Sequence, residues 1–101
     1  MLYSPSMDGL ELFQNYPNPF TNSTEIRYTI PSPGGHVLLR VFNTLGQEIR
    51  VLADEDEAGG QYKVRFDGTS FPSGQYTYTL VFTATEGGTV GKAIKKMYLV
   101  R

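Results

Sequence analysis

The stretch Tyr76-Thr77-Tyr78-Thr79-Leu80-Val81-Phe82 (YTYTLVF) alternates large apolar side chains with threonine, and Val81 is its one exception. A repeat of two places successive side chains on opposite faces, so this stretch predicts a β-strand with one buried face. The same repeat recurs at residues 26–30, 37–42, 49–53, 62–66 and 91–100. The last of these segments admits two registers, and we favour the one with Ala93, Met97 and Leu99 inward and Lys96 outward. No window of helical length has a convincing repeat of 3.6, so the sequence predicts an all-β fold.

Clusters of proline, glycine, asparagine and aspartate separate the predicted strands, as they do in proteins built from hairpins. They occupy residues 31–35, 43–46, 58–60, 67–68, 72–74 and 86–88. Gly46 is placed for the positive φ of a type I turn with a G1 bulge. Strands and turns together predict an antiparallel immunoglobulin-like β-sandwich of about seven short strands, with an open barrel as the alternative architecture.

Length and composition indicate the number of domains and the kinds of partner that the protein can have. The chain has 101 residues, the size of one domain. Nine Lys and Arg residues nearly balance ten Asp and Glu residues, giving a formal net charge of −1. Nucleic-acid-binding domains usually carry a cationic excess, so we expect no nucleic-acid partner. The absence of cysteine excludes disulfides, a thiolate nucleophile and a zinc ribbon.

The start of the chain differs from the rest in composition. Ser, Pro, Asp and Gly dominate residues 1–9, whereas Leu10, Leu12 and Phe13 begin the apolar pattern. We therefore predict a flexible linker at 1–9 and a folded domain at 10–101. No basic residue precedes Arg27, so the cationic region of a secretory signal peptide is missing, and we expect the chain to be cut from a larger protein.

No arrangement of side chains in the sequence predicts catalysis. His36 is the single histidine and is interpreted as a solvated turn residue. The acidic run 54–57 lacks the spacing of an EF-hand loop and is interpreted as a solvated hairpin loop rather than a calcium site. A Ser/His/Asp arrangement and a phosphate-cradling glycine loop are missing. We expect a protein that is not an enzyme and has no cofactor, metal or small-molecule substrate.

Two features of the sequence are not typical of a generic β-domain. The first is the proline segment, Gln14-Asn15-Tyr16-Pro17-Asn18-Pro19-Phe20 (14–20). Its two X-Pro bonds favour extended backbone, so we expect a stiff, extended segment anchored by Tyr16 and Phe20, which either seals an open end of the core or serves a function. The second is the basic stretch 92–101, which contains no acidic residue and includes Lys92, Lys95, Lys96 and Arg101. Lysines at such a position also commonly protect an edge strand from pairing.

With these features in place, the chain resembles the C-terminal sorting domain family of the type IX (Por) secretion system over about Leu10 to Arg101. The resemblance begins at Leu12–Phe20, where the family has Leu-x-x-Asn-Tyr-Pro-Asn-Pro-Phe. It continues through three internal blocks, Ser23–Tyr28, Val41–Ile49 and Phe66–Gly68 with Phe71–Tyr76. It ends at a Lys-Met-x-Leu tail, here Lys96–Leu99. Phe71 stands where leucine is usual, and the loop at 83–89 looks long.

The resemblance implies a seven-stranded sandwich that serves as an address label on a covalently linked upstream cargo protein. The implied partners are the outer-membrane translocation machinery and a sortase-like peptidase that cuts before Asn15. The implied route is the periplasm in transit, then the cell surface or the medium. The implied sorting-signal residues are Asn15, Tyr16, Pro17, Asn18, Pro19, Phe20, Lys95, Lys96, Met97 and Leu99; the implied structural turn residues are Gly46, Asp67, Gly68, Pro72, Gly74 and Tyr76.

Two other classes of protein stay open as alternatives. The hairpin and the Asp-Gly…Gly-x-Tyr blocks also resemble the structural immunoglobulin-like domain of flagellar hook-capping proteins. A carbohydrate-binding accessory module of a secreted enzyme is the other alternative. It would need an exposed aromatic platform, whereas we expect the tyrosines at 28, 62, 76 and 78 to lie in the core.

Overall fold

The computed structural model describes residues 3–4 and 7–101, and these residues form strands joined by turns and loops. The strands are β1 (Tyr3–Ser4), β2 (Glu11–Leu12), β3 (Ser23–Phe42), β4 (Glu48–Asp67), β5 (Gly74–Ala84) and β6 (Val90–Leu99). In the described part of the chain, no helix has the length and apolar character needed to cross a membrane. The prediction of an all-β fold is confirmed.

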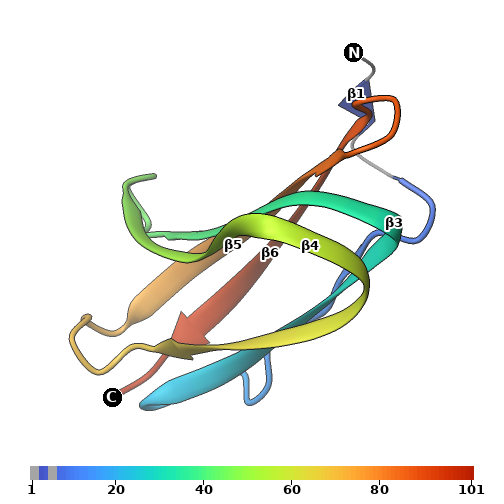
Figure 1. Ribbon diagram of the computed structural model, residues 1–101. Helices are drawn as coiled ribbons and strands as arrows, with labels where there is room; N and C mark the ends of the chain where they lie inside the picture. Colours follow the sequence, from blue (N-terminus) through green and yellow to red (C-terminus); the bar gives the residue numbers. More distant parts are fainter. Residues whose placement is uncertain (1–2, 5–6) are drawn as a thin grey trace.

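The strands form one connected sheet in the order β1-β6-β5-β3-β2, and β4 pairs with the other edge of β3 from end to end, with register shifts on the way. Every pairing is antiparallel except the short parallel one between β1 and β6. Figure 1 shows the long β3–β4 pair curving over β5 and β6. The sheet therefore folds back on itself and encloses a single apolar core.

The expected number of strands is wrong, because β3 and β4 each join two of the predicted strands. The ladder between them runs on through the turn-like residues, with Gly34 opposite Ala58 and a register shift between Ile30 and Gly34. This irregularity changes which side chains point inward: even-numbered residues up to Ile30 are buried, and odd-numbered residues are buried from Val37 on. The clusters at 31–35 and 58–60 therefore form one bend that the two paired strands share, and neither cluster is the turn of a hairpin.

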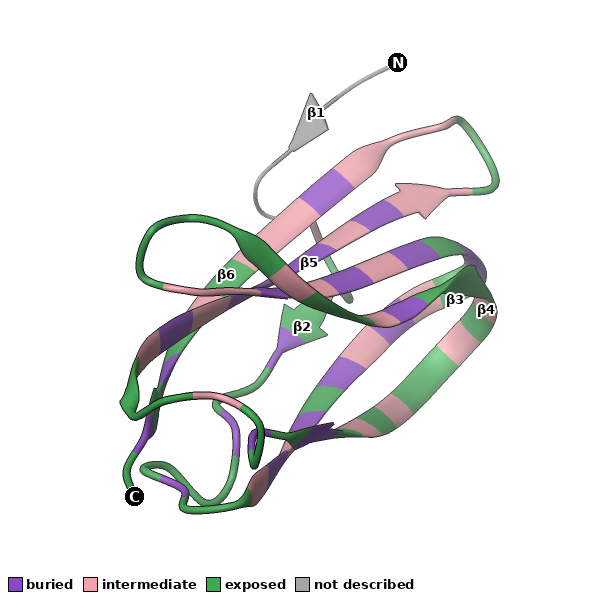
Figure 2. Ribbon diagram, turned by 90° about the vertical axis from the view of Figure 1, so that its left-hand side faces the viewer, coloured by how far each residue is buried: buried purple, intermediate pink, exposed green. Residues whose placement is uncertain are grey.

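Buried residues alternate with more exposed ones along β3 (Figure 2), and side chains that the alternation places inward form the core. Large rings from both halves of the folded sheet meet there, and Phe20, Tyr28, Phe66, Tyr78 and Phe82 are all at most 2% exposed. In the last strand, Met97 and Leu99 point inward and Lys96 outward, as predicted. The alternation of apolar side chains therefore locates most of the core. Two expected positions differ: Val51, beside a register shift in the β3–β4 ladder, is 45% exposed, and Tyr62 is only half-buried.

The turn at 43–46 also follows its prediction. Gly46 has a φ of 82°, and its amide donates to the Asn43 carbonyl oxygen at 3.0 Å. The Asn43 side-chain oxygen accepts from the amides of Leu45 and Gln47, both at 3.0 Å. A residue with a Cβ is strained at such a φ, which explains the glycine.

Candidate functional site

The structure brings together the two predicted parts of the sorting signal. The proline segment lies along the outer edge of β6: the Phe20 amide donates to the Tyr98 carbonyl at 2.9 Å, and the Val100 amide donates to the Phe20 carbonyl at 2.9 Å. The Asn18 side-chain oxygen accepts from the Tyr98 amide at 3.0 Å, across 80 positions of sequence. The Gln14 side-chain amide donates to the Lys96 carbonyl at 2.7 Å. The chain end is thus paired over several residues with the segment that opens the domain.

Asn15 holds the start of the proline segment in place. It is only 2% exposed, and its backbone amide donates to the Tyr78 hydroxyl oxygen at 2.8 Å. Its side-chain amide donates to the Pro17 carbonyl at 3.1 Å and to the Thr24 hydroxyl oxygen at 2.9 Å. Burial raises the pKa of Tyr78 to about 12, so its hydroxyl keeps its proton and donates to the Phe13 carbonyl at 2.7 Å. A buried network in which each polar group finds a partner fixes one conformation.

The two aromatic residues of the segment have opposite environments. Phe20 is buried and contacts Phe66 edge to face, with 6.0 Å between ring centroids. Tyr16 is 80% exposed, so its predicted role as an anchor is wrong. Its backbone amide and carbonyl both bond to Glu25, and this bridge to β3 holds the residue while its ring faces outward. Residues 17–19 form bends, so the expected extended course of the segment is wrong as well.

The predicted residues of β6 divide between the core and the surface. Met97 and Leu99 are at most 1% exposed, Lys95 is half-buried, and Lys96 is exposed. The alternate positions form what we call the outward row, namely Ile94, Lys96, Tyr98 and Val100. The three apolar members of the outward row are 43–55% exposed. The three apolar residues are not among the predicted site residues, although the inward prediction for Met97 and Leu99 places their neighbours outward.

Apart from Gly46, which lies in the turn between β3 and β4, the predicted structural turn residues surround the connection between β4 and β5. The Asp67 carboxylate accepts from the Thr69 amide at 3.0 Å, which lowers its pKa. Gly68 is buried and donates its amide to Asn22 at 2.8 Å, and Gly74 begins β5. The buried Tyr76 donates its hydroxyl to the Pro72 carbonyl at 2.6 Å. The C-terminal Arg101 is bound to this loop, because its guanidinium donates to the carbonyls of Gly68 and Phe71.

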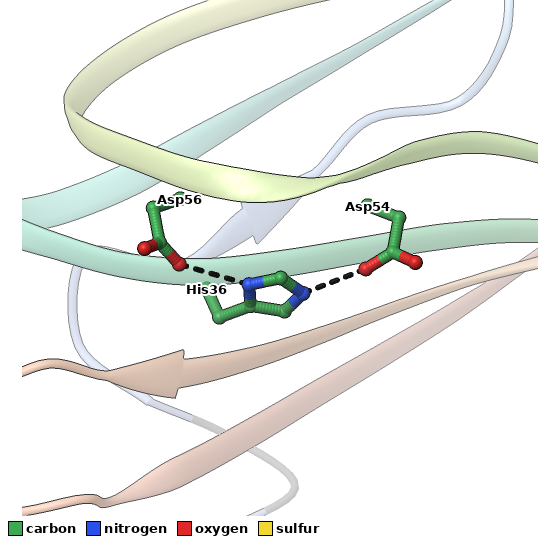
Figure 3. A network of polar contacts seen from close by, with 3 residues as sticks. All are labelled: His36, Asp54 and Asp56. Carbon is green, nitrogen blue, oxygen red and sulfur yellow. Dashed lines mark hydrogen bonds and ion pairs between the residues drawn. The ribbon is translucent and has the colours of Figure 1, made fainter.

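The acidic run lies in β4, so the predicted hairpin loop at 54–57 is wrong. Asp54 and Asp56 flank His36 of β3, with ring-nitrogen to carboxylate distances of 2.7 and 2.8 Å (Figure 3). The hydrogen bond to Asp56, followed by that to Asp54, raises the pKa of the exposed His36. His36 lies within a strand rather than in the predicted turn. In the described part of the chain, no three His, Asp or Glu side chains are arranged to hold a metal ion.

An open cavity of about 340 Å³ lies beside Tyr16 and is lined by residues of the proline segment, β3 and β4. The aromatic rings of Phe13 and Tyr16 border it together with the polar side chains of Arg27 and Gln61. Phe13 is 42% exposed, so two aromatic residues near the proline segment are accessible at the surface. Exposed aromatic side chains of this kind are common where a protein meets a partner.

Fold and surface together define a small all-β domain whose C-terminal strand is joined to its opening segment. The chain belongs to the family described as the secretion system C-terminal sorting domain, which matches residues 14–96. This confirms the family resemblance drawn from the motifs. A search of curated proteins found no match.

Solved structures share the fold. A part of dimeric latent PorU from Porphyromonas gingivalis is 22% identical with a TM-score of 0.66; the match covers 86% of this chain and only 9% of that one. The sulfur carrier protein SoxY from Chlorobium limicola f thiosulfatophilum is 10% identical with a TM-score of 0.59, and 99% of this chain and 86% of that chain are covered. An LPMO from Kitasatospora papulosa is 10% identical with a TM-score of 0.57, over 83% of this chain and 51% of that chain. At these identities the likeness concerns the fold alone.

Proposed function

We propose that this domain is a non-catalytic signal that directs a covalently linked upstream cargo protein across the outer membrane through the type IX system. The cargo passes through the periplasm and is then displayed on the cell surface or released. The observation that carries the proposal is the hydrogen bonding between the proline segment and β6. It brings the two ends of the family motif onto one surface of the domain. A partner that binds this surface would therefore recognise the domain only when it is folded.

The contact with the translocation machinery is formed by the exposed residues of this surface. The outward row combines three large apolar side chains with the cation of Lys96, and Tyr16 lies on the neighbouring segment. Apolar side chains gathered on a small domain are typical of a protein contact site. Asn15, Phe20, Met97 and Leu99 contribute indirectly, because they are buried and hold the exposed residues in position.

The architecture that we propose is an immunoglobulin-like sandwich in which β3 and β4 each contribute to both layers. The hydrogen bond from the Tyr76 hydroxyl to the Pro72 carbonyl, four residues upstream, supports this assignment. It has the form of the tyrosine corner that occurs in such sandwiches. The 9/10 boundary between linker and domain stays a prediction, and residues 1, 2, 5 and 6 of the proposed linker lie outside the described part.

Removal of the domain by a sortase-like peptidase requires backbone that can extend into the peptidase. Leu12 is buried and paired with Tyr28 in β3, so a cut at or after Leu12 would require β2 to detach. We therefore place the cut before Glu11. Proteolytic sites concentrate where few contacts hold the backbone.

The test is an export assay in a host with the type IX machinery, using a periplasm-directed fluorescent reporter fused ahead of residues 1–101. Deleting residues 92–101 would be a poor probe, because it removes Met97 and Leu99 from the core. We would instead replace two exposed residues of the surface, Tyr16→Ser with Tyr98→Ser. The matched control is Leu45→Ser with Val51→Ser, which are 82% and 45% exposed on other parts of the domain.

Export of the unchanged fusion and of the control, with the Tyr16/Tyr98 variant held in the periplasm, is the expected result. Equal export of all three fusions would overturn the proposed contact surface but not the sorting role. A folded, unchanged domain that leaves its reporter in the periplasm would overturn the sorting role and leave a structural module.

A further inference from the structure

Among the described residues, β4 pairs with β3 alone, so one edge of this 20-residue strand has no neighbouring strand. Such an edge presents a row of backbone donors and acceptors to any strand that fits it. Charged side chains usually protect an edge of this kind from pairing. On β4, however, the acidic run 54–57 lies on one side of the glycine pair 59–60, and the two bases Lys63 and Arg65 lie on the other.

The hydrogen bonds on the far side of β3 show which β4 residues turn their backbone amides and carbonyls to the open edge. Arg27 and Glu25 bond to Phe13 and Tyr16, on the side of β3 away from β4. In an antiparallel ladder the residues opposite them must face outward, and these are Lys63 and Arg65.

The same reasoning applies to the other half of β4. The Gly34 carbonyl accepts from Thr85 on the β5 side, so His36 and Leu38, two and four residues further on, face that way as well. Their partners Asp56 and Asp54 therefore present their amides and carbonyls at the open edge.

We infer that a second copy of this chain pairs with β4, antiparallel and edge to edge, around a twofold axis between Gly59 and Gly60. In this register Asp54 lies opposite Arg65 of the second copy, and Asp56 lies opposite Lys63. In the single chain, the backbone amides and carbonyls of all four residues already point to the open edge of β4. Each pair also matches an exposed acid with an exposed base on the outer face of the sheet.

Other registers do not fit as well. A shift by one residue would place outward side chains opposite inward ones. A shift by two residues would keep the faces but lose one of the two opposite-charge pairs in each half. The charges therefore act against promiscuous pairing and in favour of one symmetric arrangement. The interface is small, so the dimer is expected to be weak, with a Kd of about 10⁻⁴ M.

The test uses the 101-residue chain and two reversed variants. The acid-reversed variant carries Asp54→Lys and Asp56→Lys, and the base-reversed variant carries Lys63→Glu and Arg65→Glu. Each variant places like charges opposite one another in its own homodimer, which weakens self-association at least tenfold (about 1.4 kcal/mol or more). A mixture of the two restores all four opposite-charge pairs, so a heterodimer forms.

Sedimentation velocity over a concentration series measures the association of each species. Amide hydrogen exchange at Asp56 and Lys63, compared between dilute and concentrated protein, locates the interface. The control is Glu11→Lys with Glu86→Lys, which has the same net charge as the acid-reversed variant and changes exposed residues away from β4. This control must self-associate like the unchanged chain. Mixed with the base-reversed variant, it must associate more weakly than the acid-reversed variant does, because only two of the four opposite-charge pairs can then form.

Restored association in the mixture cannot come from misfolded variants, so it supports the inference directly. A chain that stays monomeric to 1 mM, about tenfold above the expected Kd, with unprotected edge amides overturns the inference. A dimer that neither reversal weakens overturns it too, because its interface then lies elsewhere.

Discussion

Replacing Phe20 by alanine tests whether the proline segment is part of the folded core. The ring is 2% exposed, contacts Phe66 at 6.0 Å between centroids, and lies beside Gly68. Truncating a buried phenylalanine removes its transfer free energy and leaves a cavity, which together cost about 3–5 kcal/mol of unfolding free energy. For a domain of this size, the melting temperature should fall by at least about 12 °C.

Tyr16→Ala is the matched comparison, because this aromatic residue lies four positions earlier in the same segment and is 80% exposed. Its backbone bonds to Glu25 do not need the side chain. The expected change in unfolding free energy is within about 0.5 kcal/mol. Urea unfolding of both variants, with the m-value checked for each, measures the difference.

A cost below about 1 kcal/mol for Phe20→Ala would refute the reasoning, since a side chain this buried cannot be removed so cheaply. A similar cost for the two variants would refute it as well. If the difference is found, Tyr16→Ala becomes the useful variant for export, because any loss of secretion then reflects recognition rather than unfolding.

Two further predictions concern the bend of β3 and the histidine beside it. A Cβ at Gly35 would lie 2.1 Å from the Thr83 carbonyl oxygen; Gly35→Ala should therefore separate β3 from β5 and cost about 1–3 kcal/mol or more in urea unfolding. His36 has a folded pKa above its ordinary value, so its stabilising contribution is complete below about pH 6.5 and is lost as the pH rises through the folded pKa. An NMR titration of His36 should show the raised pKa, and the Asp54→Asn/Asp56→Asn variant should return it toward the ordinary value; an unchanged pKa in that variant would contradict the assignment.

The strand faces were predictable from the sequence because they depend on a local rule. Within a strand, side chains alternate, so Ile26, Tyr28 and Ile30 must share a face whatever they pack against. The number of strands was not predictable in this way. Pro31–Gly35 and Ala58–Gly60 have the composition of hairpin turns, but the two clusters lie near each other across the β3–β4 ladder and bend together. Only their pairing distinguishes a bend from a chain reversal.

At the candidate site, the exposure of the two aromatic residues of the proline segment was equally unpredictable from the local sequence. Tyr16 and Phe20 have similar sequence surroundings, each next to a proline and an asparagine or threonine. Their exposure is decided by partners that are remote in sequence, Glu25 for Tyr16 and Tyr98 for Phe20. No local pattern contains that information.

The family motif therefore identifies the fold more directly than it identifies the contact surface. Four of its residues, Asn15, Phe20, Met97 and Leu99, are buried, whereas Tyr16 and Lys96 of the same motif are exposed. If the translocation machinery recognises the folded domain, as we propose, it cannot touch these four side chains, and any effect of theirs on sorting would pass through the positions that they impose on their neighbours. Tyr16, Lys96 and Tyr98 lie on the surface beside them. If the motif acts through geometry, conservative changes in the core that preserve folding should be tolerated for export, whereas changes to these exposed side chains should not.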